Sequence, residues 1–167
     1  IGLNFYNFIR VSLKLKDLAT SATDNPLCGT DKLCAGLGWE PYPEGFYLAI
    51  KRMHHAFPNL PMYITENGIG TDNDAWRQNV LIDHLKMMHK ALQEGIDIKG
   101  YFYWSLIDNF EWAQGYMSRF GLVAVDFKTQ KRTIKPSGKL YAQIAKANAI
   151  SSSILKKFPQ DIYRPIV

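Results

Sequence analysis

Hydrophobic and polar positions along this chain follow two different periods, which predict strands and helices in alternation. Short β-prone runs alternate with longer segments in which apolar residues recur every three or four positions, as on one face of a helix. The strands are predicted at residues 1–6, 60–66 and 99–106, and the helices at residues 43–57, 73–94 and 137–147. Strands that alternate with helices in this way predict an α/β fold with a parallel sheet.

Residues near the helix ends support these boundaries. Pro43 opens the first helix, where its missing N–H costs no hydrogen bond, and Pro58 ends it. Asp72 or Asn73 can cap the second helix, and Ser137 can cap the third. The apolar faces are expected at Phe46, Ile50, Met53 and Phe57, at Trp76, Val80 or Leu81, Leu85, Met88 and Leu92, and at Leu140, Ile144 and Ala147.

The remaining segments have no sustained period. Residues 10–42 contain several glycines and prolines, which predicts a long loop. Trp39 and Tyr42 near its end could contact a ligand, but packing is the more common role for such aromatic residues. The other expectations are one domain at residues 1–148, a small hairpin within residues 113–132 and a flexible tail at residues 149–167.

The richest candidate chemistry follows the third strand. Residues 101–112 read Tyr-Phe-Tyr-Trp-Ser-Leu-Ile-Asp-Asn-Phe-Glu-Trp, an aromatic run that changes abruptly to polar residues at Ser105. Glu111 lies between two aromatic residues, with Trp104 seven positions earlier. Flat apolar faces beside a strong hydrogen-bond acceptor suit sugars, which present an apolar C–H face and a hydroxyl rim. A buried strand and its exit turn would explain the run without function, but burying both Asp108 and Glu111 would then be costly.

A second carboxylate stands at the end of the second strand. The segment Tyr63-Ile-Thr-Glu-Asn-Gly68 closes a β-prone run on Glu66 and then a glycine. The first strand ends with Asn4 and Tyr6, which in isolation would be a turn-forming asparagine and a core tyrosine. Candidate site residues therefore lie at the C-terminal end of each predicted strand or directly after it.

With these segments together, the chain resembles the family 1 glycoside hydrolases, the retaining β-glycosidases built on a (β/α)8 barrel. The matching motifs are Ile1-Gly-Leu-Asn-Phe-Tyr6, Ile64-Thr-Glu-Asn-Gly68, Trp104-Ser-Leu-Ile-Asp-Asn-Phe-Glu-Trp112 and Gly115-Tyr-Met-Ser-Arg-Phe-Gly121. The resemblance runs to about Asn148 and implies the C-terminal part of such a TIM barrel, with about three of its eight βα units. It also implies that an N-terminal part of the barrel is missing from this chain.

The resemblance implies a role for each motif residue. Glu66 matches the family's nucleophile, which must stay ionised, and Tyr6 would donate its hydroxyl to that carboxylate. Trp104 would form the floor of the sugar site, Glu111 would accept hydrogen bonds from two sugar hydroxyls, and Phe120 would form a wall. The implied substrate-binding residues are Asn4, Trp104, Glu111, Trp112 and Phe120.

The acid/base partner of this family lies in a Thr-Phe/Leu-Asn-Glu-Pro segment, and these 167 residues contain none. A retaining glycosidase needs two carboxyl groups about 5 to 5.5 Å apart. We therefore expect hydrolysis of β-D-glycosides by the complete barrel and negligible activity for this chain alone. The alternative is a non-catalytic carbohydrate-binding or decayed remnant of such an enzyme.

The nature of the sugar can be narrowed by one contrast. Similar enzymes that act on 6-phosphoglycosides replace the glutamate at Glu111 with a small residue and carry a Lys and a Tyr in the following loop. Here the corresponding positions hold Glu111, Ser118 and Phe120. Because a carboxylate would repel a phosphate, the resemblance implies an unphosphorylated β-glycoside as substrate.

Composition adds little to this assignment. The net charge is +5, and nine basic residues fall between Lys128 and Arg164 against Asp161 alone, but such runs are usually solvated surface. We therefore expect no nucleic-acid partner. No run approaches the roughly 18 apolar residues of a membrane span, so no membrane partner is expected.

The cysteines and histidines do not predict a metal site. Cys28 and Cys34 lie in a turn-rich stretch with no partnering cluster of histidines or cysteines, so we expect no zinc and no other cofactor. Two free thiols are favoured over a disulfide, which would need an oxidising compartment. The sequence leaves the compartment open, with the cytoplasm slightly favoured.

Overall fold

The computed structural model describes residues 1–8 and 39–158. Its elements are β1 (Gly2–Phe5), α1 (Pro43–Ala56), β2 (Met62–Asn67), α2 (Asp74–Gln93), β3 (Ile98–Tyr103), the 3₁₀ helix η1 (Trp112–Gln114), β4 (Val123–Val125), β5 (Arg132–Ile134), α3 (Pro136–Ala147) and α4 (Ser152–Lys157). Most of the long loop predicted at residues 10–42 lies outside the described residues, and so do Cys28 and Cys34.

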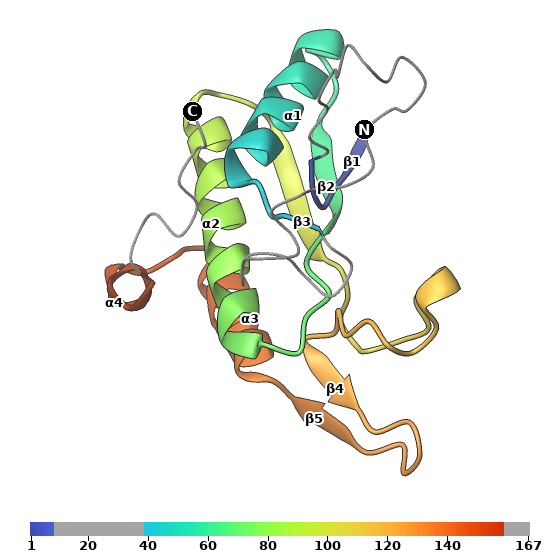
Figure 1. Ribbon diagram of the computed structural model, residues 1–167. Helices are drawn as coiled ribbons and strands as arrows, with labels where there is room; N and C mark the ends of the chain where they lie inside the picture. The colour runs from blue at the N-terminus through green and yellow to red at the C-terminus, as the bar shows by residue number, and fades with distance from the viewer. Residues whose placement is uncertain (9–38, 159–167) are drawn as a thin grey trace, which may run out of the picture.

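The main sheet has the strand order β1-β2-β3, and both pairings are parallel. Figure 1 shows α1 and α2 packed together against this sheet. Along β2, Met62 and Ile64 are buried beneath the helices, whereas Tyr63 and Thr65 point to the other face and are exposed. The prediction of parallel βα units is confirmed.

Helix α2 begins and ends as its sequence indicates. Asn73 is its N-cap, and the side chain accepts a hydrogen bond from the backbone N–H of Trp76 at 3.1 Å. After the helix, Gly95 adopts φ +88°, a left-handed conformation that favours glycine. Likewise, α1 begins at Pro43, as predicted.

The N-terminus of α3 differs from the prediction. Lys135, not Ser137, is the N-cap, and Ser137 is buried in the first turn. The carboxylate of Asp74 accepts from the Ser137 backbone N–H at 2.9 Å and from its hydroxyl at 2.5 Å. A side chain from α2 therefore supplies the acceptor that an N-cap normally provides.

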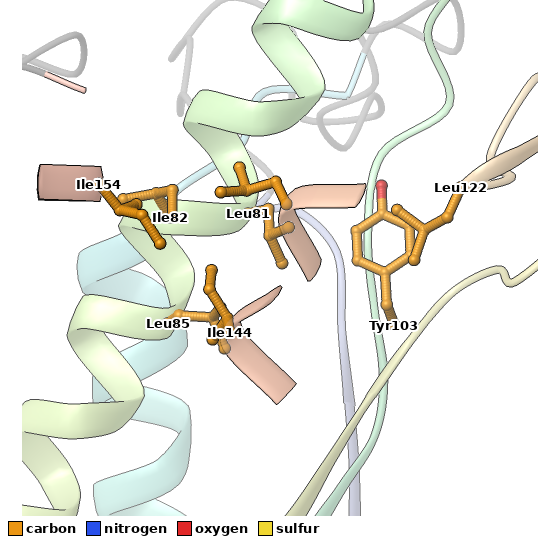
Figure 2. Packing of buried hydrophobic residues seen from close by; sticks show 8 residues of the cluster. Leu81, Ile82, Leu85, Tyr103, Leu122, Ile144 and Ile154 are labelled. Atoms are coloured by element: carbon orange, nitrogen blue, oxygen red, sulfur yellow. The ribbon is translucent and has the colours of Figure 1, made fainter. Parts of the chain in front are cut away.

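The hydrophobic core has two main clusters on the helix side of the sheet. The first joins α2, α3, α4 and the end of β3, and Figure 2 shows it: Leu81, Ile82, Leu85, Tyr103, Leu122, Leu140, Ile144 and Ile154. The second lies between α1 and β2: Phe46, Ile50, Met62, Ile64, Ala91 and Ile96. Three residues expected on apolar faces, Phe57, Leu92 and Ala147, are instead exposed, because they lie at the C-terminal ends of their helices.

The C-terminal segment is folded further than predicted. The expected flexible tail at residues 149–167 contains α4, whose N-cap Ser151 accepts from the Ile154 backbone N–H at 3.3 Å. Ile154 is 4% exposed and belongs to the first core cluster. Because an apolar side chain here finds a place in the core, the prediction is wrong for this helix; residues 159–167 lie outside the described residues.

A hairpin is present as β4 and β5, which pair antiparallel and project from the end of the main sheet in Figure 1, but β5 extends beyond the predicted range of residues 113–132. None of the helices in the described part of the chain is long and apolar enough to cross a bilayer.

Candidate active site

Tyr6 and Glu66 meet at the carboxyl ends of the neighbouring strands β1 and β2. The Tyr6 hydroxyl donates to Glu66 Oε2 at 2.5 Å. Burial raises the pKa of Tyr6 well above its usual value, and the hydrogen bond to Glu66 and the negative charges of Glu66 and Glu111 raise it further. Tyr6 therefore remains a proton-bearing donor to this carboxylate at neutral pH.

The second carboxylate is held by a tryptophan at the end of β3. The indole N–H of Trp104 donates to Glu111 Oε2 at 3.2 Å, and the peptide bond between Trp104 and Ser105 is cis. The Glu111 backbone N–H also donates to the carbonyl of Gly115 at 2.6 Å, which closes the turn. An ionised carboxylate has about four acceptor positions, so Glu111 retains capacity to accept from hydroxyl groups of a ligand.

Two aromatic rings pack beside the tyrosine. The ring centroid of Tyr6 lies 5.5 Å from that of Trp39 and 6.1 Å from that of Phe120, which meets it edge-on. Phe120 is 2% exposed, and a Cβ at Gly70 would come within 2.8 Å of its ring. Trp39 also packs against the small cluster of Ile69 and Val80, so the packing role considered for it is observed.

The remaining predicted residues are less enclosed. Asn4 pairs in register with Glu66, and its side-chain oxygen accepts from the Thr65 hydroxyl at 2.6 Å on the open face of the sheet. Trp112 is 82% exposed and adopts φ +44°. The structure thus brings Tyr6 into contact with both Glu66 and Phe120, joins Trp104 to Glu111, and leaves Trp112 facing solvent.

The sequence interpretation gave no role to Asn67, which connects all three strands beneath the site. This side chain is 1% exposed; it donates to the carbonyl of Phe5 at 2.7 Å and accepts from the Tyr101 hydroxyl at 2.7 Å. Its position directly after Glu66 was the available signal. The sequence could not show that its amide is buried between two neighbouring strands.

Asp108 is buried, as the sequence analysis considered, so the free-energy cost of removing its charge from water has to be offset. Its Oδ1 accepts from the Gly121 backbone N–H at 2.8 Å and from Lys135 Nζ at 3.1 Å, and its Oδ2 lies 3.7 Å from the Arg119 guanidinium. Two cations and a backbone donor therefore offset its desolvation. Burial lowers the pKa of Lys135, while its contact with Asp108 opposes that change.

A cavity of about 440 Å³ lies next to Asp108, not at Glu66. Its charged lining residues are balanced in number: Asp72, Asp108, Asp126, Arg119, Lys131 and Lys135. The described part of the chain contains no group of three or more His, Cys, Asp or Glu side chains that could hold a metal ion.

Comparisons with known proteins show which family this chain resembles in sequence. The family model described as glycosyl hydrolase family 1 matches residues 1–150. β-Glucosidase A from Thermotoga maritima is 45% identical over 169 residues, covering 90% of this chain and 35% of that protein. A β-galactosidase from Sulfolobus acidocaldarius is 36% identical over 160 residues, covering 92% of this chain and 32% of that protein.

Solved structures of similar proteins also match the fold of this chain. A β-glycosidase from Pyrococcus horikoshii matches with a TM-score of 0.83 and 37% identity, covering 95% of this chain and 37% of that one. A family 1 β-glucosidase from Thermotoga maritima in complex with isofagomine lactam matches with a TM-score of 0.79 and 39% identity, covering 90% and 35%. The chain spans about a third of the length of the relatives it matches.

Proposed function

Because the chain belongs to glycosyl hydrolase family 1, we propose that it supplies the nucleophile and the sugar-binding wall of a retaining β-glycosidase site. Glu66 is the nucleophile of this proposal. The observation that carries it is the 2.5 Å hydrogen bond from Tyr6 to Glu66 at the adjoining ends of two parallel strands. In barrel enzymes, catalytic groups lie at the carboxyl ends of the strands.

The proposed reaction proceeds by two displacements. Glu66 attacks the anomeric carbon, the glycosidic C–O bond breaks, and a second carboxyl group protonates the departing oxygen. That group then takes a proton from water, which attacks the anomeric carbon, releases the sugar and regenerates the Glu66 carboxylate. The hydrogen bond from Tyr6 orients the carboxylate for the first attack.

The second carboxyl group is proposed to come from outside these residues. The chain contains no Thr-Phe/Leu-Asn-Glu-Pro segment, and Glu111 is already fixed by the indole of Trp104. In the proposal, β1, β2 and β3 are consecutive strands of an eight-stranded barrel whose other strands carry the proton donor. The 167 residues alone would then be inactive, since general acid help is worth about 10²- to 10⁴-fold.

The proposed substrate is an unphosphorylated β-glycoside. Glu111 has free acceptor positions and would bind two adjacent sugar hydroxyls, while Trp104 would supply apolar surface and the buried Phe120 would support the wall of the site behind Tyr6. Trp112 is proposed to contact a ring hydroxyl, and Asn4 to line the same pocket. Relatives named as β-glucosidase and as β-galactosidase support a glucose or galactose unit.

Fragment complementation tests this proposal. The 167-residue chain is co-expressed with the part of Thermotoga maritima β-glucosidase A that remains after its matching third is removed. We call this assembly the complemented enzyme. Hydrolysis of an aryl β-glucoside is expected only when both pieces are present and only when Glu66 is intact, so Glu66→Gln should abolish it.

Covalent labelling identifies the nucleophile directly. A 2-fluoro glycoside that traps the glycosyl-enzyme should add one sugar mass to the peptide containing Glu66. Glu94 is the matched control, since it also accepts a tyrosine hydrogen bond at 2.5 Å but lies at the end of α2. A label on any other residue would overturn the proposal. Sugar binding without turnover in the complemented enzyme would favour the non-catalytic alternative.

A further inference from the structure

We propose that Arg77, on α2, is a positioning residue for the Glu66 site, an inference that rests on the function proposed above. Its guanidinium bonds the backbone carbonyls of Thr71 and Arg119, where the segments that follow β2 and β3 meet. In this way Arg77 holds Phe120 against Tyr6, and Tyr6 against the carboxylate. Nothing in the linear pattern of α2 marks this role, because Arg77 stands between Trp76 and Gln78 in the first turns of the helix, where an arginine would ordinarily be read as a surface residue.

The guanidinium is enclosed. Arg77 is 0% exposed, and one of its terminal nitrogens donates to both carbonyls, at 2.6 Å in the case of Arg119. The other terminal nitrogen lies 3.3 Å from Asp74 Oδ1. The Thr71 backbone N–H also donates to the Arg119 carbonyl at 3.1 Å, so Arg77 covers a junction between two segments that are 48 positions apart in sequence (119 − 71 = 48).

This junction is next to proposed site residues in both segments, the nucleophile Glu66 and the aromatic Phe120. Thr71 follows Glu66 by five positions, and Arg119 directly precedes Phe120. On the other side of Phe120, the Gly121 backbone N–H donates to buried Asp108 at 2.8 Å. Phe120 is therefore fixed from both ends, by Arg77 before it and by Asp108 after it.

The Phe120 ring transmits this constraint to the nucleophile. It meets the Tyr6 ring edge-on at 6.1 Å between centroids, and the Tyr6 hydroxyl is 2.5 Å from Glu66. The packing at Gly70, where a Cβ would approach the Phe120 ring to 2.8 Å, leaves little room for a different ring position. A shift of the 119–121 segment would move the tyrosine donor away from the carboxylate.

Stability alone is a poor reason for an arginine at this position. A buried ion pair costs desolvation that apolar residues of the same volume avoid, so such pairs often add little net stability. Arg77 Nε also has no hydrogen-bond partner among the described residues, which adds to the cost. What the planar guanidinium provides is bonds in fixed directions to more than one acceptor at once.

Kinetics of the complemented enzyme test the inference. We express kcat per active site that can be labelled at Glu66. On this basis Arg77→Ala should lower kcat about 10- to 100-fold, while KM changes by less than about threefold. Small misplacements of reacting groups have effects of this size. Added guanidinium ion should restore part of kcat in Arg77→Ala. Arg52→Met, which removes an exposed arginine of α1, is the control and should leave both parameters unchanged.

The outcomes separate this inference from the proposed function. If the wild-type complemented enzyme is not labelled at Glu66, the proposed function fails, whatever Arg77 does. If Glu66 is labelled but Arg77→Ala keeps its kcat per labelled site, the positioning role is wrong. A loss of labelled sites with unchanged kcat would mean that Arg77 only stabilises the fold, and would also overturn the inference.

Hydrogen exchange of the full 167-residue chain gives a second measurement that needs no activity. Arg77→Lys keeps the charge but removes the planar fork. Exchange at the Thr71 and Gly121 amides should become at least about tenfold faster in this variant, while amides of α1 keep their protection. Unchanged exchange at both amides would contradict the proposed clamp.

Discussion

Tyr6 and Tyr47 each donate a hydroxyl hydrogen bond to a glutamate at 2.5 Å, but in different surroundings. Tyr6 is half-buried among aromatic rings beside Glu66, whereas the bond from Tyr47 to Glu94 lies on the exposed surface of α1. The same chemical pair therefore occurs once at the proposed site and once far from it in the fold. This makes Tyr47 an internal control for the role of Tyr6.

We predict that Tyr6→Phe lowers kcat/KM of the complemented enzyme about 10- to 100-fold. A hydrogen bond to a charged group is worth about 1.5 to 3 kcal/mol, and here it orients the nucleophile. Tyr47→Phe should leave kcat/KM unchanged, although it removes a bond of the same length. Steady-state kinetics with an aryl β-glucoside measure both variants. Equal effects of the two substitutions would argue against a role for Tyr6.

His84 on α2 provides a pH-dependent prediction. The ring is 1% exposed and packs against Phe5 and Phe46, and burial lowers its pKa to about 4, although its contact with the Val80 carbonyl opposes this. The folded chain thus holds a neutral imidazole, while the unfolded chain binds a proton below about pH 6.5. Stability is complete above that pH and is lost as the pH falls towards about 4.

Urea unfolding at a fixed chain concentration measures this effect. Each pKa unit is worth about 1.4 kcal/mol, so the difference between 6.5 and about 4 corresponds to about 3 kcal/mol of lost stability. His84→Gln should flatten the pH dependence between pH 7 and pH 4. His55→Gln, at an exposed position of α1, should not change it. A wild-type chain equally stable at pH 4 and pH 7 would contradict the prediction.

Residue-level reasoning from the sequence was strongest for chemistry at strand ends. Glu66, Tyr6 and Glu111 are part of recognisable sequence motifs, and the structure brings the Tyr6 hydroxyl to the Glu66 carboxylate. Arg77 and Asn67 could not be found in this way, because each bonds a partner more than 30 positions distant, the Arg119 carbonyl for Arg77 and the Tyr101 hydroxyl for Asn67. Burial of a polar side chain depends on tertiary contacts that a local pattern does not contain.

At the scale of elements, local signals predicted the three long helices and the three strands of the main sheet, but they missed α4 and misassigned the N-cap of α3. Ser137 has the residue type of an N-cap, yet α3 begins with Pro136 and Ser137 turns inward. The reason is Asp74, 63 positions earlier, which accepts from both the backbone and the hydroxyl of Ser137. A tertiary acceptor took the place of the local cap, and α2 and α3 are joined at their N-termini.

We predict that Asp74→Ala destabilises the chain by about 3 to 5 kcal/mol. The substitution leaves the buried Arg77 without its carboxylate, which has a cost of this size, and removes the acceptor for the first turn of α3. Ser137→Ala removes only the hydroxyl donor and should cost about 1 kcal/mol. Urea unfolding of both variants and of the double variant should show coupling between them. Additive effects would contradict a shared network.

At the scale of the whole molecule, the helices of residues 1–8 and 39–158 cover only one side of the sheet. The helices pack on the face that contains Met62 and Ile64 (Figure 1). Tyr63 and Phe102 occupy alternate strand positions that face the other side, and they are 41% and 57% exposed. Within the described residues, β1 and β3 each pair on one edge only. Parallel sheets are normally covered on both faces, and unpaired edges promote association with other strands.

This arrangement predicts that the 167-residue chain self-associates when it is expressed alone. Sedimentation velocity should show dimers or larger species at micromolar concentration, and Phe102→Glu should reduce them by placing a charge on the exposed face. The same substitution should weaken complementation if this face is the one that the rest of the barrel covers. Leu48→Glu is the control, because Leu48 is an exposed residue of α1 on the opposite side of the fold, and it should alter neither result. A wild-type monomer that melts cooperatively would show that the open face is tolerated, and the argument from unpaired edges would then fail.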